Sequence, residues 1–294
     1  MSSSITEAQV QSFRDEFRIL GQQMPSRFRN WCQVDSGIVG ASKAMERIGA
    51  SEAYDITSRH ADTKYVDTPH SRRWCDMQDK GWADLVDEMD KIKMLGDPTS
   101  PYQRIGNAAL NRSMDTIILT AARGNSRTNT SVIALPAGQK IAEGGTGLTL
   151  SKLFTTKEIL DAAEIDDMED EDGQKSGKEA TRVIACSARQ ITNLLNTTEI
   201  KSVDYNNVKA LAQGQIDTFM GFKFKRTERL AKSGTTRFCT AWIKGCVGLG
   251  IGKDIVSNID VLPGKNYSVQ VYARMSIGAT RLEDEGVVEI GCFE

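Results

Sequence analysis

The chain contains only two histidines, His60 and His70, and Asp62 and Asp67 lie between them. Imidazole and carboxylate groups can bind a divalent metal when the fold brings them together. One interpretation of this segment is therefore a metal site in a metal-dependent enzyme. Such a site needs both rings and a carboxylate to converge across ten residues. Solvated or inter-subunit contacts are the favoured interpretation.

The same stretch, Ser58 to Trp74 (SRHADTKYVDTPHSRRW), is dense in arginine, histidine and aspartate. A segment this long without helical periodicity is normally functional or disordered. Guanidinium and carboxylate groups suit paired contacts with another protein surface. The residues expected to form inter-subunit contacts are Arg59, His60, Asp62, Asp67, His70, Arg72 and Arg73, together with Phe13 and Phe17 near the N-terminus.

Residues 168–179 partly resemble a calcium-binding loop. Acidic residues or glycine occupy its third, fifth, sixth and twelfth positions. The first ligand position is Met168, however, and a thioether is a poor ligand for a hard cation. An acidic surface loop without calcium is the favoured interpretation.

Four glycines between residues 245 and 252, followed by Lys253, suggest a phosphate-binding loop. The spacing does not fit G-x-x-x-x-G-K-[ST], because Val247 stands in place of the first glycine and Asp254 follows the lysine. Small residues in a tightly packed strand are the better interpretation. Since no Ser/His/Asp or Cys/His order indicates a nucleophile, we expect no enzyme activity, no cofactor and no bound metal.

Composition narrows the class of protein. The 294 residues include 37 basic and 39 acidic side chains, so the net charge of −2 predicts neither a coat on nucleic acid nor attachment to an anionic membrane. Six scattered cysteines without a CxxC motif indicate reduced thiols. Residues 1–20 are too charged for a signal peptide, and no apolar run approaches the roughly 18 residues of a membrane span.

The longest predicted element is a helix over residues 97–124. Asp97 can cap it, Pro98 is tolerated in the first turn, and Gly124 supplies a left-handed stop. Apolar residues recur at three- and four-residue steps, which draws one apolar stripe down the helix. A rod of roughly 35–40 Å with such a stripe needs a partner layer.

Two partner layers are predicted. A second helix over residues 150–165, capped by Thr149, carries its own apolar stripe. Residues 267–277 alternate strictly between apolar and polar side chains, which is typical of a half-buried strand. Residues 287–290 predict a returning strand that pairs with it antiparallel.

Other patterns predict the remaining elements. A helix over residues 4–20, with Phe13 and Phe17 in its stripe, either docks on its own core or lies on a neighbouring subunit. Residues 38–56 and 72–78 fit the two strands of a long hairpin, and residues 82–95 predict a helix. An α+β unit follows, with strands at 183–186, 220–226, 237–244 and 247–251. Ser187 is expected to cap a short helix through Leu195, and a further helix is predicted over 204–213.

The chain resembles the major capsid (coat) proteins of tailed bacteriophages, which have the α+β Hong Kong 97 capsid fold. The resemblance covers most of the sequence and rests on the order of five segments rather than on a catalytic motif. These segments are Ser58–Arg73, Met94–Tyr102, Ala134–Leu150, Asp204–Phe224 and Gly278–Ile290.

The resemblance implies a division into arm, loop and domains. It implies an N-terminal arm at 1–33 and an extended E-loop hairpin at 34–80. Residues 81–180 would form a P-domain that contains a long spine helix. An A-domain follows at 181–261, and P-domain return strands at 262–294.

The resemblance also implies a function. The subunit would assemble into hexamers and pentamers of an icosahedral shell around double-stranded DNA, which it would contact non-specifically. It would be made in the host cytoplasm and reside in the virion, with portal, scaffolding and decoration proteins as partners and no membrane. An encapsulin-like nanocompartment shell protein is the alternative within this fold.

Deletion of Ser58–Arg73 is expected to leave a soluble, folded subunit that cannot build a shell, because the segment would lie across a neighbour. Electron microscopy of the purified variant tests this expectation. Normal particles would refute the assembly role.

Overall fold

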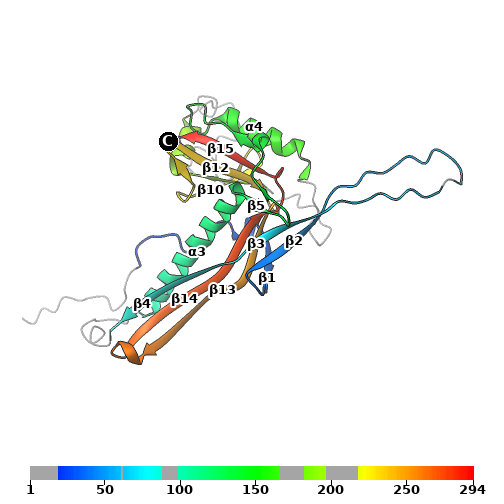
Figure 1. Ribbon diagram of the computed structural model, residues 1–294. Coiled ribbons are helices and arrows are strands. Elements are labelled where there is room, and N and C mark those ends of the chain that lie inside the picture. The colour runs from blue at the N-terminus through cyan, green and yellow to red at the C-terminus, as the bar shows by residue number, and fades with distance from the viewer. Residues whose placement is uncertain (1–18, 61, 88–98, 166–181, 197–217) are drawn as a thin grey trace, which may run out of the picture. The chain divides into compact units, whose positions relative to one another are not determined.

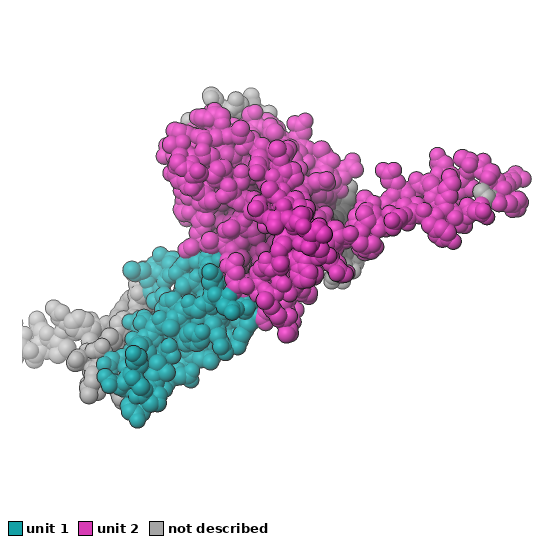
Figure 2. Space-filling model, in the orientation of Figure 1, with its two compact units in different colours: residues 1–26, 79–113, 253–276 teal, residues 27–78, 114–252, 277–294 magenta. Residues whose placement is uncertain are grey.

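The computed structural model describes residues 19–60, 62–87, 99–165, 182–196 and 218–294. The chain divides into two compact units, shown in different colours in Figure 2. Unit 1 comprises residues 1–26, 79–113 and 253–276, and unit 2 comprises residues 27–78, 114–252 and 277–294. Helix α3 (Thr99–Arg123) and strands β13 (Val247–Leu262) and β14 (Ser268–Arg281) each contribute to both units.

Helix α3 confirms the predicted rod (Figure 1). It has 25 residues, and its buried apolar side chains form one stripe. In unit 1 its first half packs on strand β4 (Gln78–Val86), where Gly106 leaves room for the ring of Trp82. Gln103 Nε2 donates a 2.6 Å hydrogen bond to Ser257 Oγ of β13. The sheet beneath has the strand order β1-β13-β14-β4, with β1 at Gln33–Ser36.

Unit 2 is built on a seven-stranded mixed sheet. Strands β12 and β15 form its centre, and they pair antiparallel from Thr236 opposite Phe293 to Trp242 opposite Val287. The sheet order is β7-β15-β12-β8-β10-β9, with β11 paired to β12. These strands are β7 (Lys140–Ile141), β8 (Arg182–Cys186), β9 (Thr218–Phe219), β10 (Phe222–Arg226), β11 (Lys232–Ser233), β12 (Thr236–Ile243) and β15 (Val287–Phe293).

Successive side chains of a strand point to opposite faces of a sheet. Each face of this sheet therefore has its own set of side chains, and a different element covers each. On one face lies helix α4 (Leu150–Ala162), whose Asp161 forms a 2.6 Å ion pair with Arg182 at the start of β8. On the other face lies the second half of α3, where the Arg123 guanidinium sits 4.2 Å from the ring centroid of Phe238. The 3-10 turn η1 (Arg29–Trp31) joins it there, since Trp242 Nε1 donates to the carbonyl of Trp31 at 3.0 Å.

The predicted helix caps of unit 2 are confirmed. Thr149 Oγ1 accepts from the amide of Lys152 at the start of α4, and Ser187 Oγ accepts from the amide of Gln190 at the start of α5 (Ala188–Leu195). Within α4, the buried Lys152 ammonium lies 2.7–3.0 Å from four carbonyl oxygens, which share its three N–H donors and tie the helix to β15 and to the preceding loop. Burial lowers the pKa of this lysine. The four acceptors belong to Glu143, Thr146, Gly147 and Gly291.

A small third sheet, with the order β2-β3-β5-β6, forms the base of the predicted hairpin. Its cluster of buried side chains contains Met45, Cys75 and Leu282, with Met77 packed against them. Two of the four glycines between residues 245 and 252 lie against this cluster: a Cβ on Gly248 would stand 2.5 Å from Met45 Sδ, and one on Gly250 would stand 2.7 Å from Ile38 Cδ1. The predicted packing role in a strand is therefore confirmed for these two, whereas Gly245 precedes β13 and supplies a positive φ. The strands are β2 (Ser42–Ile48), β3 (His70–Asp76), β5 (Ser126–Arg127) and β6 (Val132–Ile133).

Four predictions are wrong. Helix α4 is not the packing partner of α3, because the two helices lie on opposite faces of the seven-stranded sheet. The outward strand of the hairpin covers Ser42–Ile48 instead of residues 38–56, since residues 49–56 form no strand.

Residues 82–86 belong to strand β4 rather than to a helix, because pairing with β14 overrides a weak helical propensity. Strands β14 and β15 do not form the expected terminal pair. The chain turns at Leu282, whose amide bonds to the carbonyl of Cys246 at 2.8 Å, and β15 then enters the seven-stranded sheet.

Several predicted features lie outside the described residues. These are the N-terminal helix up to residue 18, the cap at Asp97, the calcium-like loop at 168–179 and the helix at 204–213. Among the described residues, no helix combines the length and apolar character needed to cross a membrane. The arm, loop and domain ranges stay predictions.

Gly278→Ala should destabilise unit 2, because its Cβ would meet the backbone carbonyl of Asp76 in β3 and the sulfur of Cys75. Forced overpacking against backbone costs about 1–3 kcal/mol. Urea unfolding of the unassembled subunit measures the change. Gly138→Ala is the matched control, since a Cβ there meets nothing within 4 Å. Equal stability of the two variants would contradict the close approach of β14 to β3.

Candidate assembly surfaces

A projecting hairpin loop belongs to unit 2. Strands β2 and β3 pair antiparallel from Ser42 opposite Asp76 to Ile48 opposite His70. The described residues between them, 49–69, contain no helix or strand, and every side chain except that of Thr68 is exposed. Figures 1 and 2 show this loop projecting from the rest of its unit.

The structure places the predicted contact residues of this segment along the one hairpin. Arg59, His60, Asp62 and Asp67 lie exposed in the loop, and His60 adopts a left-handed backbone conformation at its turn, with φ at 61°. His70 is exposed at the first residue of β3. The two other predicted contact residues, Phe13 and Phe17, lie outside the described residues.

The hairpin does not assemble the hypothetical metal site. His60 stands at the turn, whereas His70 opens β3 at the other end of the return leg, residues 62–69. Eight extended residues span roughly 26 Å. Within the part of the chain that the structure describes, no three His, Cys, Asp or Glu side chains lie together as a metal-binding group.

Arg72 and Arg73 have different environments. Arg72 lies on the exposed face of the hairpin and pairs with Glu46 of β2 at 2.9 Å. Arg73 points to the opposite face and is only 4% exposed. Its guanidinium pairs with Asp284 of the same chain at 2.7 Å, so its partner is supplied within the subunit rather than across an interface.

Asp284 is shared by two buried arginines. Its second carboxylate oxygen accepts from Nε of Arg281 at 2.6 Å, and Arg281 is fully buried. The Arg281 guanidinium also donates to the carbonyls of Ala122 and Gly124 at the C-terminal end of α3, and to that of Ile133 in β6 at 3.1 Å. A cation at this position interacts favourably with the helix dipole.

Sequence reasoning missed this network. Arg281 and Asp284 stand three residues apart inside the segment Gly278–Ile290, which contributed to the resemblance without a role for either side chain. The only signal was a pair of opposite charges beside a turn. Their burial depends on β3 and α3, which are far away in the sequence.

Five of the six cysteines have a raised pKa and are unsuited to nucleophilic chemistry. The exception is Cys292, whose pKa is lowered by its hydrogen bond with Cys239. All six are buried and free of disulfides. Burial raises the pKa of Cys75 to about 11 and those of Cys186 and Cys246 to about 12. Because the thiolate is the reactive form, these thiols are inert near neutral pH.

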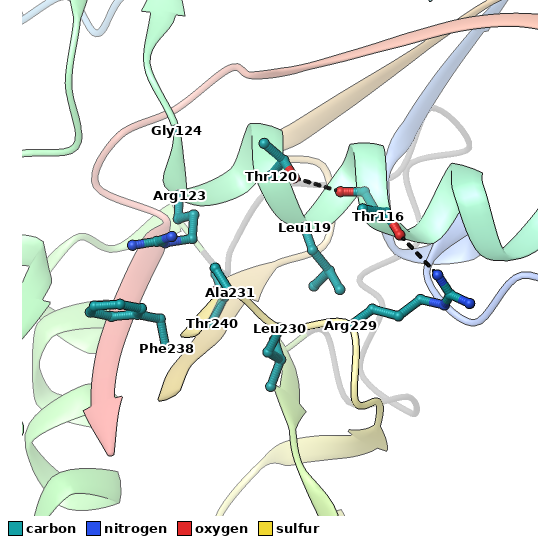
Figure 3. Close-up of a pocket in the computed structure, with 10 residues that line it drawn as sticks. All are labelled: Thr116, Leu119, Thr120, Arg123, Gly124, Arg229, Leu230, Ala231, Phe238 and Thr240. Carbon is teal, nitrogen blue, oxygen red and sulfur yellow. Dashed lines mark hydrogen bonds between the residues drawn. The ribbon is translucent and has the colours of Figure 1, made fainter. Parts of the chain in front are cut away.

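A groove of about 450 Å³ separates the C-terminal half of α3 from the loop at 229–231 (Figure 3). Leu119, Leu230 and Phe238 give it an apolar floor, and Arg123 and Arg229 are its titratable groups. Guanidinium groups stay protonated in proteins, so the groove holds no general base. Its chemistry is that of a packing surface rather than a catalytic site.

Solved capsid structures share this architecture at low sequence identity. The capsid of Ralstonia phage GP4 matches with a TM-score of 0.75 at 9% identity, covering 97% of this chain and 95% of that one. The capsid of the Cyanophage P-SCSP1u matches with a TM-score of 0.71 at 15% identity, covering 99% of this chain and 95% of that one. A chain from Mycobacterium phage Che8 matches with a TM-score of 0.69 at 16% identity, covering 96% of this chain and 97% of that one. No curated protein sequence matches the chain.

The long helix, the mixed sheet and the projecting hairpin define a shell-forming protein with the Hong Kong 97-type capsid fold. The sequence profile described as phage capsid protein matches residues 5–294, and the chain therefore belongs to the phage capsid protein family. It is a coat protein that self-assembles into an icosahedral shell, and a structural component of the virion. A nanocompartment shell is not favoured by these matches.

Asp284→Asn should destabilise unit 2 strongly, because it leaves two buried guanidiniums without a counter-charge. Loss of one partner from a buried ion pair costs about 3–5 kcal/mol. Chemical unfolding of the unassembled subunit measures this loss.

Asp76→Asn is the matched control for that variant. Its partner Arg127 is on the surface, and exposed pairs contribute about 0–1 kcal/mol. If the two variants unfold at the same denaturant concentration, the buried network is not a main source of stability.

Proposed function

We propose that this protein is the major capsid subunit of a tailed bacteriophage, forming hexamers and pentamers that enclose double-stranded DNA. The family match over residues 5–294 supports a capsid role for the whole chain. The net charge of −2 supports enclosed DNA as contents, because a strongly basic wall would bind phosphates and resist their repacking.

The observation that carries the proposal is the exposed loop at 49–69. Ile56 is 83% exposed and Tyr65 is 94% exposed, although both side chains are apolar enough to favour burial. Removal of apolar surface from water contributes about 25 cal/mol per Å². The loop therefore gains free energy if it lies across a neighbouring subunit, which would act as an E-loop does in this fold.

Contacts of this kind suit a closed shell. A loop that reaches onto the next subunit makes a heterologous contact, and such contacts close when their rotations add to a full turn. The exposed charges of Arg59, Asp62 and Asp67 would then lie in the interface as paired groups. Arg72, with its partner Glu46, would border it at the base of the loop.

Further partners follow from the same role. Portal and scaffolding proteins would guide assembly, and a decoration protein would bind the outer surface. The subunit would be made in the host cytoplasm before it enters the virion. It would carry out no reaction of its own, in keeping with the inert thiols and the absence of a catalytic group in the described groove.

The loop can be removed more precisely than by the deletion of Ser58–Arg73. That deletion would take four residues from β3 and break the Arg73–Asp284 pair, so the subunit would not fold normally. Gly49 N donates to the carbonyl of Pro69 at 2.8 Å, which makes these two residues the natural closing point. Replacing residues 50–68 by Asn-Gly would keep the register of β2 and β3.

This loop-less variant should be soluble and should unfold at the same temperature as the wild type, but should form no shells. Circular dichroism and electron microscopy of the two proteins, each expressed with its neighbouring genes, measure both properties. A second variant has residues 50–68 replaced by a Gly/Ser linker of equal length. It tests whether assembly needs the side chains of the loop or only a connection of that length. Uniform shells from the loop-less variant would overturn the proposal.

A further inference from the structure

Five basic side chains gather in unit 2 around strand β10, and we call them the β10 basic patch. Lys223 and Lys225 stand on the same side of this edge-proximal strand, while Phe222 and Phe224 are buried on the other side. The patch consists of Arg27, Lys223, Lys225, Arg226 and Arg229.

Hydrogen bonds to neighbouring elements fix two arginines of the patch. Arg27 Nη1 donates to the backbone carbonyl of Arg226 at the end of β10. The amide of Arg27 bonds to both oxygens of Asp115 at 3.1 Å, and Arg229 Nη1 reaches the hydroxyl of the next helical residue, Thr116, at 3.5 Å. Two arginines of the patch are thus fixed beside the same turn of α3, as the close-up in Figure 3 shows for Arg229.

The described carboxylates do not neutralise this patch. In the part of the chain that the structure describes, none of its five cations forms a salt bridge. Asp115 is fully buried and is occupied by the amides of Arg27 and Phe28. Glu228 accepts from the amide of Ala188 and pairs with Arg237. The positive charge is therefore available to a partner, although the whole chain is slightly acidic.

The character of the patch favours phosphate over protein as that partner. Protein interfaces need buried aromatic or aliphatic anchors. Among the described residues from 218 to 243, no large apolar side chain is exposed. The partly exposed ring of Trp31 lies under the Lys223 ammonium, whose nitrogen is 5.9 Å from the ring centroid, and is the one aromatic group described against the patch. A phosphate group can be bound by cations alone. Lys223 and Lys225 are alternate residues of one strand, so their side chains leave the same face about 7 Å apart. Contacts to phosphate carry no sequence information, so they suit nucleic acid of any base sequence.

We infer that the β10 basic patch lies on the inner side of the shell and contacts the phosphate backbone of packaged duplex DNA. This inference rests on the proposed function, since it requires a shell that encloses DNA. Five contacts at most bind weakly and in a salt-dependent manner, so packaged DNA could still move along the wall. An acidic segment of an assembly partner is the competing occupant, and the test separates the two.

The first experiment measures binding of unassembled subunits to a 30-base-pair duplex by fluorescence anisotropy at increasing salt. The test variant is Lys223→Gln/Lys225→Gln/Arg226→Gln. Each lost phosphate contact should reduce the slope of log K against log salt by about 0.9, so three lost contacts reduce it by about 2.7. The charge-retaining variant Lys223→Arg/Lys225→Arg should keep the wild-type slope, which shows that a change is not due to misfolding.

The matched control is Lys253→Gln/Lys265→Gln/Arg274→Gln, which removes three exposed charges from unit 1. It should leave the slope unchanged. A fall in slope equal to that of the test variant, or no fall in either, would overturn the inference.

The second experiment cross-links DNA-filled wild-type particles and maps the peptides attached to DNA. The peptide containing Lys223 and Lys225 should be among them. Filled shells in which this peptide attaches to another protein instead of DNA would overturn the inference in favour of an acidic partner, while leaving the proposed function intact. If the wild type builds no DNA-filled shells at all, the proposed function fails first.

Discussion

One partly exposed carboxylate, that of Asp284, lies between two buried guanidiniums and links the elements of unit 2. Asp284 holds Arg73 of the hairpin and Arg281 of β14, and Arg281 in turn binds the last carbonyls of α3 and a carbonyl of β6. Charges removed from water are costly unless each is paired and hydrogen-bonded. Arg73 Nη2 is paired with Asp284, whereas its buried Nη1 has no partner among the described residues. These ion pairs form only when the hairpin, the helix end and the turn before β15 take up one particular arrangement.

That arrangement is what allows the loop at 49–69 to be exposed. The loop contributes little to the stability of its own subunit, because its described side chains are exposed, apart from Thr68. Its base, in contrast, is fixed by seven paired residues in each strand and by the packing of Met45, Cys75 and Leu282. A firmly anchored hairpin with an exposed end can contact a neighbour without rearrangement of the subunit core, which suits a protein that must bind copies of itself.

The two surfaces have different chemistry. The hairpin loop carries both signs of charge together with exposed apolar groups such as Ile56 and Tyr65, as a protein partner requires. The β10 basic patch carries one sign of charge and no exposed large apolar group in its described surroundings. One near-neutral chain therefore presents a mixed surface suited to its own copies and a basic surface suited to phosphate.

Local patterns in the sequence determined the elements whose formation depends on near neighbours. The helix stripe and its stop at Gly124 predicted α3, Thr149 and Ser187 predicted two helix starts, and apolar alternation predicted the buried face of β14 from Val271 onward. These features follow from backbone periodicity and from side-chain-to-backbone bonds over a few residues.

Only the tertiary structure decided which strands pair and which charges are buried. Residues 82–86 form a strand because their backbone groups pair with β14. Strand β15 does not pair with β14, because its backbone groups pair with β12 and β7 in another sheet. Arg72 and Arg73 are adjacent and chemically identical, yet one is exposed and the other is buried against Asp284, 211 residues away. Long-range contacts set these outcomes, and no local pattern records which distant segment will supply them.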